Sequence, residues 1–219
     1  MEHKQAAKLI IQNIRMLEEA NNLLGTVIHK EIFNTIDAII QNKVSSFNED
    51  IIGVYDHYED QTWFLSSLWK LNSFDLKNHK THNDIYAYYI LDKENQKDEQ
   101  PQWWISYLFA NNFDQAIFSF RLYKNNFSNA TKTDLKLFCI QQNEKYPLLA
   151  QIGFKFNPNN LCWDLPIAFL NEQKVAQHYE NSTLEDALTP FTDALDKLNE
   201  AHEIFNSIVG DAKNKFLKE

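Results

Sequence analysis

Residues 103–123 read WWISYLFANNFDQAIFSFRLY, and this stretch decides the predicted fold. From Ala116 to Leu122 large apolar side chains alternate with smaller or polar ones, with Ile117 as the exception. A period of two on aromatic and β-branched residues is typical of a half-buried strand. Asn111 and Asn112 suit a tight turn because Asn tolerates positive φ. We therefore predict a β-hairpin with Trp103–Phe109 as its first strand, at the centre of a sheet.

Similar patterns predict the other elements. Period-two alternation predicts strands over 50–58, 62–71, 85–91, 149–156 and 161–170. Helical spacing predicts helices over 3–24, 27–44, 133–144, 172–179 and 189–209, with Gly210 as the final stop. Pro166 places the last strand at an edge or a bulge. Gly25 either separates an antiparallel pair of helices or lies within one long bent helix.

These elements predict one α+β domain over residues 1–219. A mainly antiparallel sheet of about five to seven strands forms a β-rich core over residues 50–171. N-terminal helices over residues 1–48 and C-terminal helices over residues 172–219 flank this sheet and pack on it. Adjacent Trp103 and Trp104, if both lie in a strand, face opposite sides of the sheet.

Composition excludes several functional classes. The four glycines are far apart, so neither a phosphate-binding loop nor a dinucleotide fingerprint is present. No apolar run approaches the roughly 18–20 residues of a membrane span, and the N-terminus does not read as a secretory signal. We therefore expect a cytoplasmic protein with neither membrane partner nor cofactor. Cys139 and Cys162 both lie in apolar surroundings, which favours buried free thiols.

The charge favours a protein partner. The formal net charge is −9, and only Arg15 and Arg121 are arginines. Nucleic-acid surfaces need clustered Lys and Arg, so nucleic acid is not an expected partner. Aromatic residues are concentrated in the predicted strands, and exposed Trp and Tyr beside acidic groups are typical of protein-binding surfaces. The candidate binding residues are Trp103, Trp104, Tyr107, Arg121, Tyr86 and Tyr88.

We therefore predict an acidic, cytoplasmic protein-binding module, such as an immunity- or antitoxin-type inhibitor of a basic protein partner. The chain could also form a homodimer. Electrostatic complementarity would speed the encounter with a basic partner. Arg121 lies on the polar face of its strand, where a salt bridge is the favoured interpretation and an anionic ligand the alternative.

Two other functions stay open. A metal-dependent hydrolase or nuclease would need carboxylates and histidines that converge only in the fold. Its candidate ligands are Asp56, Glu59, Asp60, His79, His82 and Asp84. A small-molecule pocket between the sheet and the C-terminal helix, lined by aromatic residues, is the third hypothesis.

Overall fold

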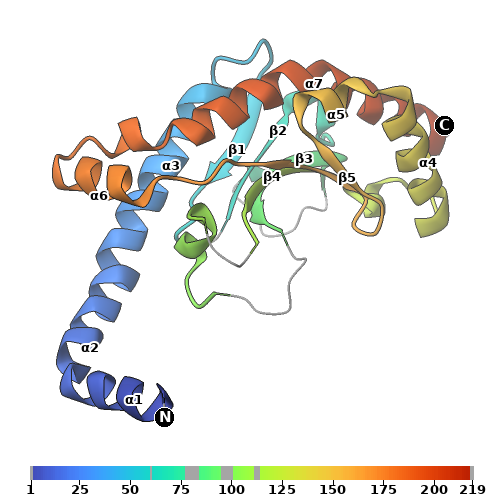
Figure 1. The fold of residues 1–219 in the computed structure, drawn as a ribbon. Helices are drawn as coiled ribbons and strands as arrows, with labels where there is room; N and C mark the ends of the chain where they lie inside the picture. Colours follow the sequence, from blue (N-terminus) through green and yellow to red (C-terminus); the bar gives the residue numbers. More distant parts are fainter. Residues whose placement is uncertain (1, 60, 77–83, 95–100, 111–113, 218–219) are drawn as a thin grey trace.

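The computed structural model describes residues 2–59, 61–76, 84–94, 101–110 and 114–217. Its centre is a six-stranded antiparallel sheet with the strand order β1-β2-β3-β4-β6-β5 (Figure 1). Helices from both ends of the chain flank this sheet, which confirms the predicted α+β class. The strands are β1 (Ile51–Tyr55), β2 (Thr62–Ser66), β3 (Ala87–Lys93), β4 (Ala116–Leu122), β5 (Lys155–Asn157) and β6 (Cys162–Pro166).

The predicted central hairpin is correct in its second strand and wrong in its first. β4 forms and pairs with β3 on one side and β6 on the other. The segment Trp104–Leu108 is instead a 3₁₀ helix, η5. A 3₁₀ helix brings positions i and i+3 onto the same side, and the rings of Trp104 and Tyr107 lie 5.7 Å apart. Residues 111–113, which include the predicted turn, lie outside the described residues.

Two further strand predictions need correction. Within 62–71 only β2 is a strand, and Ser67–Trp69 forms the 3₁₀ helix η2. Within 149–156 the first residues belong to helix α5 (Leu148–Ile152), and only the last two residues belong to β5. Gly153 ends α5 with φ of 120°, a conformation that few other residues adopt.

Pro166 does not place its strand at an edge, because β6 lies between β4 and β5. Pro166 is the last residue of β6 and faces Ile117 of β4. The pairing of β5 along β6 reaches only Asp164. Pro166 therefore lies beyond the reach of β5, where the missing N–H removes no bond to that strand.

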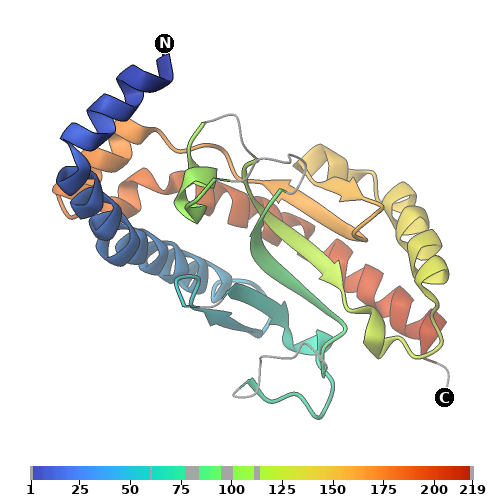
Figure 2. The same cartoon turned by 90° about the horizontal axis from the view of Figure 1, so that it is seen from below.

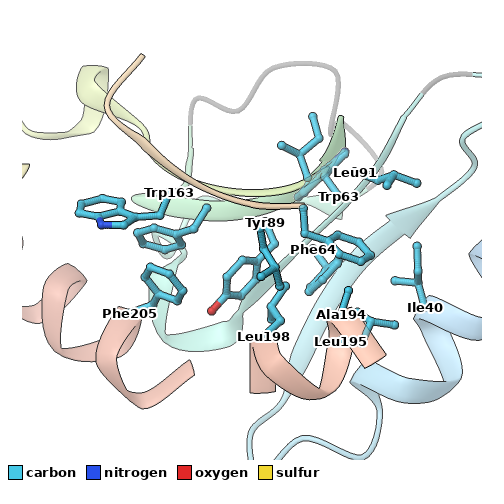
Figure 3. Packing of buried hydrophobic residues seen from close by; sticks show 14 of the residues in the cluster. Ile40, Trp63, Phe64, Tyr89, Leu91, Trp163, Ala194, Leu195, Leu198 and Phe205 are labelled. Carbon is cyan, nitrogen blue, oxygen red and sulfur yellow. The ribbon is translucent and has the colours of Figure 1, made fainter. Parts of the chain in front are cut away.

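One face of the sheet carries the aromatic core. Phe64, Tyr89, Phe120 and Trp163 occupy neighbouring register positions across β2, β3, β4 and β6. Phe205 stacks on Phe120 with ring centroids 4.1 Å apart. Figure 3 shows the rings of Phe64, Tyr89, Trp163 and Phe205 between the strands and the helices. The small-molecule pocket was predicted between the sheet and the C-terminal helix. In the described structure, these aromatic rings occupy that space.

Two helices cover this face, α3 (His29–Val44) and α7 (Thr189–Phe216), and they also contact each other (Figures 1 and 2). The predicted apolar face of α7 is confirmed, since the residues assigned to that face, which begin with Phe191 and end with Val209, are buried. Gly210 does not end α7 but lies inside it. The remaining elements are α4 (Lys132–Lys145), α6 (Glu172–Glu180), η6 (Lys124–Asn126) and η7 (Leu184–Ala187).

The N-terminal helices form an arm that leaves the body of the molecule (Figures 1 and 2). We call α1 (Glu2–Gln12) and α2 (Ile14–Leu23) the N-terminal arm. A bend at Asn13 joins them, and the π-helical turn η1 (Leu24–Ile28) continues α2 directly into α3. Gly25 thus lies within one long bent helix. Every side chain from 3 to 23 is exposed, so the prediction that the N-terminal helices pack on the sheet holds for α3 alone.

Candidate functional site

An apolar groove of about 490 Å³ lies at the base of the N-terminal arm. Three segments that are distant in the sequence form its walls: the turns around η1, the segment around η5, and α6. Nearly all of the lining side chains are apolar. They are Leu24, Ile28, Ile32, Trp103, Ile105, Ser106, Phe109, Glu172, Val175, Ala176 and Tyr179.

Local bonds hold the walls in place. The backbone N–H of Leu170 donates to the carbonyl of Leu108 over 2.8 Å, which ties the η5 segment to the start of α6. The side chain of Asn171 caps α6 by accepting from the backbone N–H of Lys174. The ring of Trp104 packs edge-on against Phe33 of α3 at 5.2 Å. The groove is therefore built on anchored elements.

An acidic hollow of about 690 Å³ adjoins the apolar groove, and Tyr179 belongs to both. The Tyr179 hydroxyl donates a hydrogen bond to Glu31, which raises the pKa of Tyr179. Glu185 and Asp186 line the hollow, and Glu172 lines the apolar groove itself. We call the apolar groove and this hollow together the composite groove. Its floor is apolar and its rim carries negative charge.

Two histidines lie where the arm joins the body. The ring of His57 stacks on Phe33 at 4.6 Å and meets Trp104 edge-on at 4.4 Å, and His29 contacts the same Phe33 ring. Burial lowers the pKa of both histidines, and that of His57 falls to about 4 because the nearby His29 adds to the effect. His29 Nε2 and His57 Nδ1 are buried without a hydrogen-bond partner in the described structure. Both rings are thus held in their neutral form.

A buried polar network crosses the core beneath α7. The Tyr89 hydroxyl lies 2.9 Å from His202 Nδ1, and His202 Nε2 lies 3.2 Å from Glu49 Oε2. Ser66 and Asn206 also donate to the Glu49 carboxylate, over 2.5 and 2.6 Å. Burial acts to raise the pKa of Glu49, but these hydrogen bonds outweigh it and lower that pKa. Since Tyr89 and His202 are almost inaccessible to solvent, the network ties α7 to the sheet and does not present a surface for substrate.

Arg121 belongs to a second polar cluster, on the face of the sheet opposite α7. Its guanidinium pairs with Asp92 over 2.5 Å and donates to Ser119 over 3.2 Å. Ser119 in turn donates to Asp164 over 2.6 Å. The favoured interpretation of Arg121 as a salt-bridge partner is therefore confirmed. Burial raises the pKa of the neighbouring Cys162 thiol to about 12, so this cluster holds no reactive thiolate.

The other predicted binding residues lie apart from one another. Trp103 is half-buried and lines the apolar groove, whereas Tyr107 is buried. Tyr88 is half-buried beside Arg121, and Tyr86 is buried against Phe127. These residues therefore do not share one exposed aromatic face of the sheet. One reason is that Trp104 belongs to η5 and not to a strand.

The predicted metal ligands are only partly described. Asp56 and Glu59 lie in one exposed turn, where the backbone N–H of Glu59 donates to Asp56. Asp84 accepts a hydrogen bond from Ser73 over 2.7 Å. Asp60, His79 and His82 lie outside the described residues. Among the residues that are described, no three His, Cys, Asp or Glu side chains are grouped so that they could hold a metal ion.

Most of the groove residues could not be singled out in advance. Val175 and Tyr179 lie in the predicted helix 172–179 and Phe109 in the predicted strand 103–109, and nothing in the sequence places these two elements side by side. The available signal was the N-terminal apolar stripe, which continues through Leu24 and Ile28 into the groove.

Comparison with protein-family models, curated proteins and solved structures gave no match. In the described part of the chain no helix is both long and apolar enough to span a membrane. The functional argument therefore starts from the geometry of the composite groove.

Proposed function

We propose that this chain is a protein-binding module that receives a basic, amphipathic segment of another protein in the composite groove. The observation that carries the proposal is the position of Tyr179, where an apolar floor meets an acidic rim. A helix or extended segment with one apolar side and flanking Lys or Arg complements both parts at once. Peptide grooves of this kind read apolar anchors at helical spacing.

The charge of the whole chain supports the same class of partner. A net charge of −9 attracts a basic protein over longer distances, and the acidic rim then selects the orientation of the bound segment. We further propose that the protein acts in the cytoplasm as an immunity- or antitoxin-type inhibitor. Covering a basic functional surface of the partner would block that surface without any catalytic step.

A pair of designed helical peptides tests the groove. One contains Leu and Lys in an amphipathic pattern, and the other has Glu in place of each Lys. We expect the basic peptide to bind and the acidic one to bind at least about tenfold more weakly, because the rim repels it. Fluorescence anisotropy of labelled peptides measures both affinities.

Variants then assign the binding to the groove. Ala176 is exposed and lines the groove, so Ala176→Phe should fill it and weaken the basic peptide at least about tenfold. Gln177→Phe places the same side chain at an exposed neighbouring position of α6 and serves as the matched control. Equal binding by both variants, or equal binding of both peptides, would contradict the proposal.

A further inference from the structure

We propose that two copies of this chain exchange their N-terminal arms, so that α1 of each copy occupies the apolar groove of the other. This inference rests on the proposed function, because it requires the groove to bind a helix, and it identifies one such helix. The chain is then both the receptor and one of the ligands of the composite groove.

The first observation is the exposed apolar stripe of the arm. Ile10, Ile14 and Leu17 follow helical spacing and are 51%, 49% and 42% exposed. Monomeric proteins rarely leave a continuous row of large aliphatic side chains open to water. The stripe leads toward the groove, because Leu24 and Ile28, farther along the same helix, form part of the groove wall.

The second observation is that an arm cannot lie along the groove of its own chain. The ten residues of α2 hold α1 about 15 Å from η1. α1 could fold back only at the bend at Asn13, and it would then lie along α2, with only its first residues near Leu24 at the edge of the groove. Figure 1 shows α1 standing away from the body. A second copy can supply α1 along the rest of the groove.

An antiparallel pairing of two α2 helices satisfies this geometry. If the two helices cross at Leu17, Ile14 of one copy lies opposite Ala20 and Asn21 of the other. The pairing requires α1 to come into line with α2 at the Asn13 bend. Ile10 then lies opposite Leu24, and α1 runs along residues 24–32 of the partner copy, where the groove lies. Asn21 interrupts the apolar stripe, and one polar residue at such a position restricts the register of a helix pair.

Charge favours the antiparallel orientation over the parallel one. Before the crossing point at Leu17 the arm carries Glu2, Lys4, Lys8 and Arg15, with a net positive charge, whereas after it the arm carries Glu18 and Glu19. Antiparallel pairing places the basic half of one arm against the acidic half of the other and brings α1 to the acidic rim of the groove. Parallel pairing would place like charges together.

A lipid surface is the other class of occupant for an amphipathic arm. Membrane-surface helices carry Lys and Arg along the whole polar face and are attracted by anionic lipid. Here Glu18 and Glu19 interrupt the basic face, and the chain as a whole is strongly acidic. These charges favour a second copy.

Sedimentation velocity of the full chain over a range of concentrations is the first test. We expect dimers, and we expect Leu17→Asp to raise the dimer dissociation constant about 100-fold or more, because the substitution places two carboxylates at the crossing point. Met16→Asp is the matched control, since Met16 lies on the same helix outside the stripe and is 61% exposed. It should dimerise like the wild type apart from a minor charge effect.

Charge reversal sharpens the test. One double variant carries Lys8→Glu and Arg15→Glu, and the other carries Glu18→Lys and Glu19→Lys. Each should dimerise poorly alone, and the two should form a mixed dimer when they are combined. A wild-type chain that stays monomeric, or a dimer indifferent to Leu17→Asp, would overturn the arm exchange. Binding of the wild type to vesicles of phosphatidylcholine and phosphatidylglycerol, lost in Leu17→Asp without dimer formation, would assign the arm to lipid instead.

Cross-linking locates α1. In a mixture of Ile10→Cys and Ala176→Cys chains, a short bifunctional maleimide should join the two variants, whereas each variant alone should not cross-link. The native Cys139 and Cys162 are both buried and free. A dimer without this cross-link would contradict the seating of α1 in the groove.

The two proposals fail separately. If the wild type is monomeric but the basic peptide still binds, only the arm exchange is wrong. If the cross-link forms but the Leu17→Asp monomer does not bind the basic peptide, the groove accepts only its own α1, and the proposed function is wrong.

Discussion

Helix α7 and the N-terminal arm show the same sequence pattern and have opposite environments. Both carry large apolar residues at helical spacing with polar residues between them. The apolar face of α7 is buried on the sheet, whereas the stripe of the arm is exposed along its whole length. The contrast teaches that an amphipathic pattern predicts a partner surface but does not tell which molecule supplies it.

The largest effect is expected in the core. Phe205 is fully buried and stacks on Phe120, so Phe205→Ala should lower the free energy of unfolding by about 3–5 kcal/mol through lost burial and a cavity. Leu17→Ala should change the same quantity by no more than about 0.5 kcal/mol in dilute, monomeric protein. Urea denaturation measures both. Similar losses for the two variants would show that the arm is already packed within one chain.

The buried network under α7 should give the next largest effect. Glu49→Ala would leave His202, Asn206 and Ser66 without their shared acceptor, at a cost of about 2–4 kcal/mol of unfolding free energy. Glu49→Gln keeps the carbonyl acceptor and should lose clearly less. Thermal and urea denaturation of the two variants provide the measurement. An equal loss in both would assign the effect to the charge of Glu49 rather than to its hydrogen bonds.

The junction between arm and body should respond to pH. The pKa of His57 is lowered from 6.5 to about 4 in the folded state, so between these values the unfolded chain binds more protons. Stability should therefore be complete above about pH 6.5 and decline toward about pH 4. At about pH 5 the titration of His57 should have lowered the free energy of unfolding by about 2 kcal/mol relative to neutral pH.

The variant His57→Phe keeps a ring against Phe33 and removes the titrating group. We expect the difference in unfolding free energy between about pH 7.5 and about pH 5 to shrink by about 2 kcal/mol in this variant. Carboxylates contribute equally to both proteins and cancel in the comparison. An unchanged pH dependence would show that His57 is not held neutral.

Much of the fold follows from local pattern. The alternation in β4 and the long apolar face of α7 each describe a surface that one dominant neighbour buries, so periodicity predicts them well. The Trp103–Phe109 segment fails because it packs through contacts distant in sequence, such as Trp104 on Phe33. A run of bulky residues has no period that separates a strand from a 3₁₀ turn.

The candidate site was predictable only in part. Trp103 and the acidic character were predicted, but the groove exists only because α6 lies beside η1. That neighbourhood depends on the helix that continues through Gly25 from η1 into α3. Gly25 was the one break that the sequence suggested, whereas the bend forms at Asn13. Whether the chain turns or continues at Gly25 thus decides where the site lies.

Two glycines provide the smallest and most selective test of the contrast. Gly25 and Gly210 both lie in helical segments, and a Cβ at either position would meet no atom within 4 Å. Replacing glycine by alanine within a helix stabilises that helix by about 0.5–1 kcal/mol. Gly210→Ala should raise the global unfolding free energy by this amount, because α7 is integral to the core.

Gly25→Ala should leave global unfolding nearly unchanged in dilute protein and instead slow amide hydrogen exchange along the arm. The reason is that the arm contacts little of its own chain, so it can open without unfolding the sheet. Hydrogen exchange followed by mass spectrometry separates the two responses. Equal gains in global stability would mean that arm and core unfold as one unit, and the arm would then need no second copy to order it.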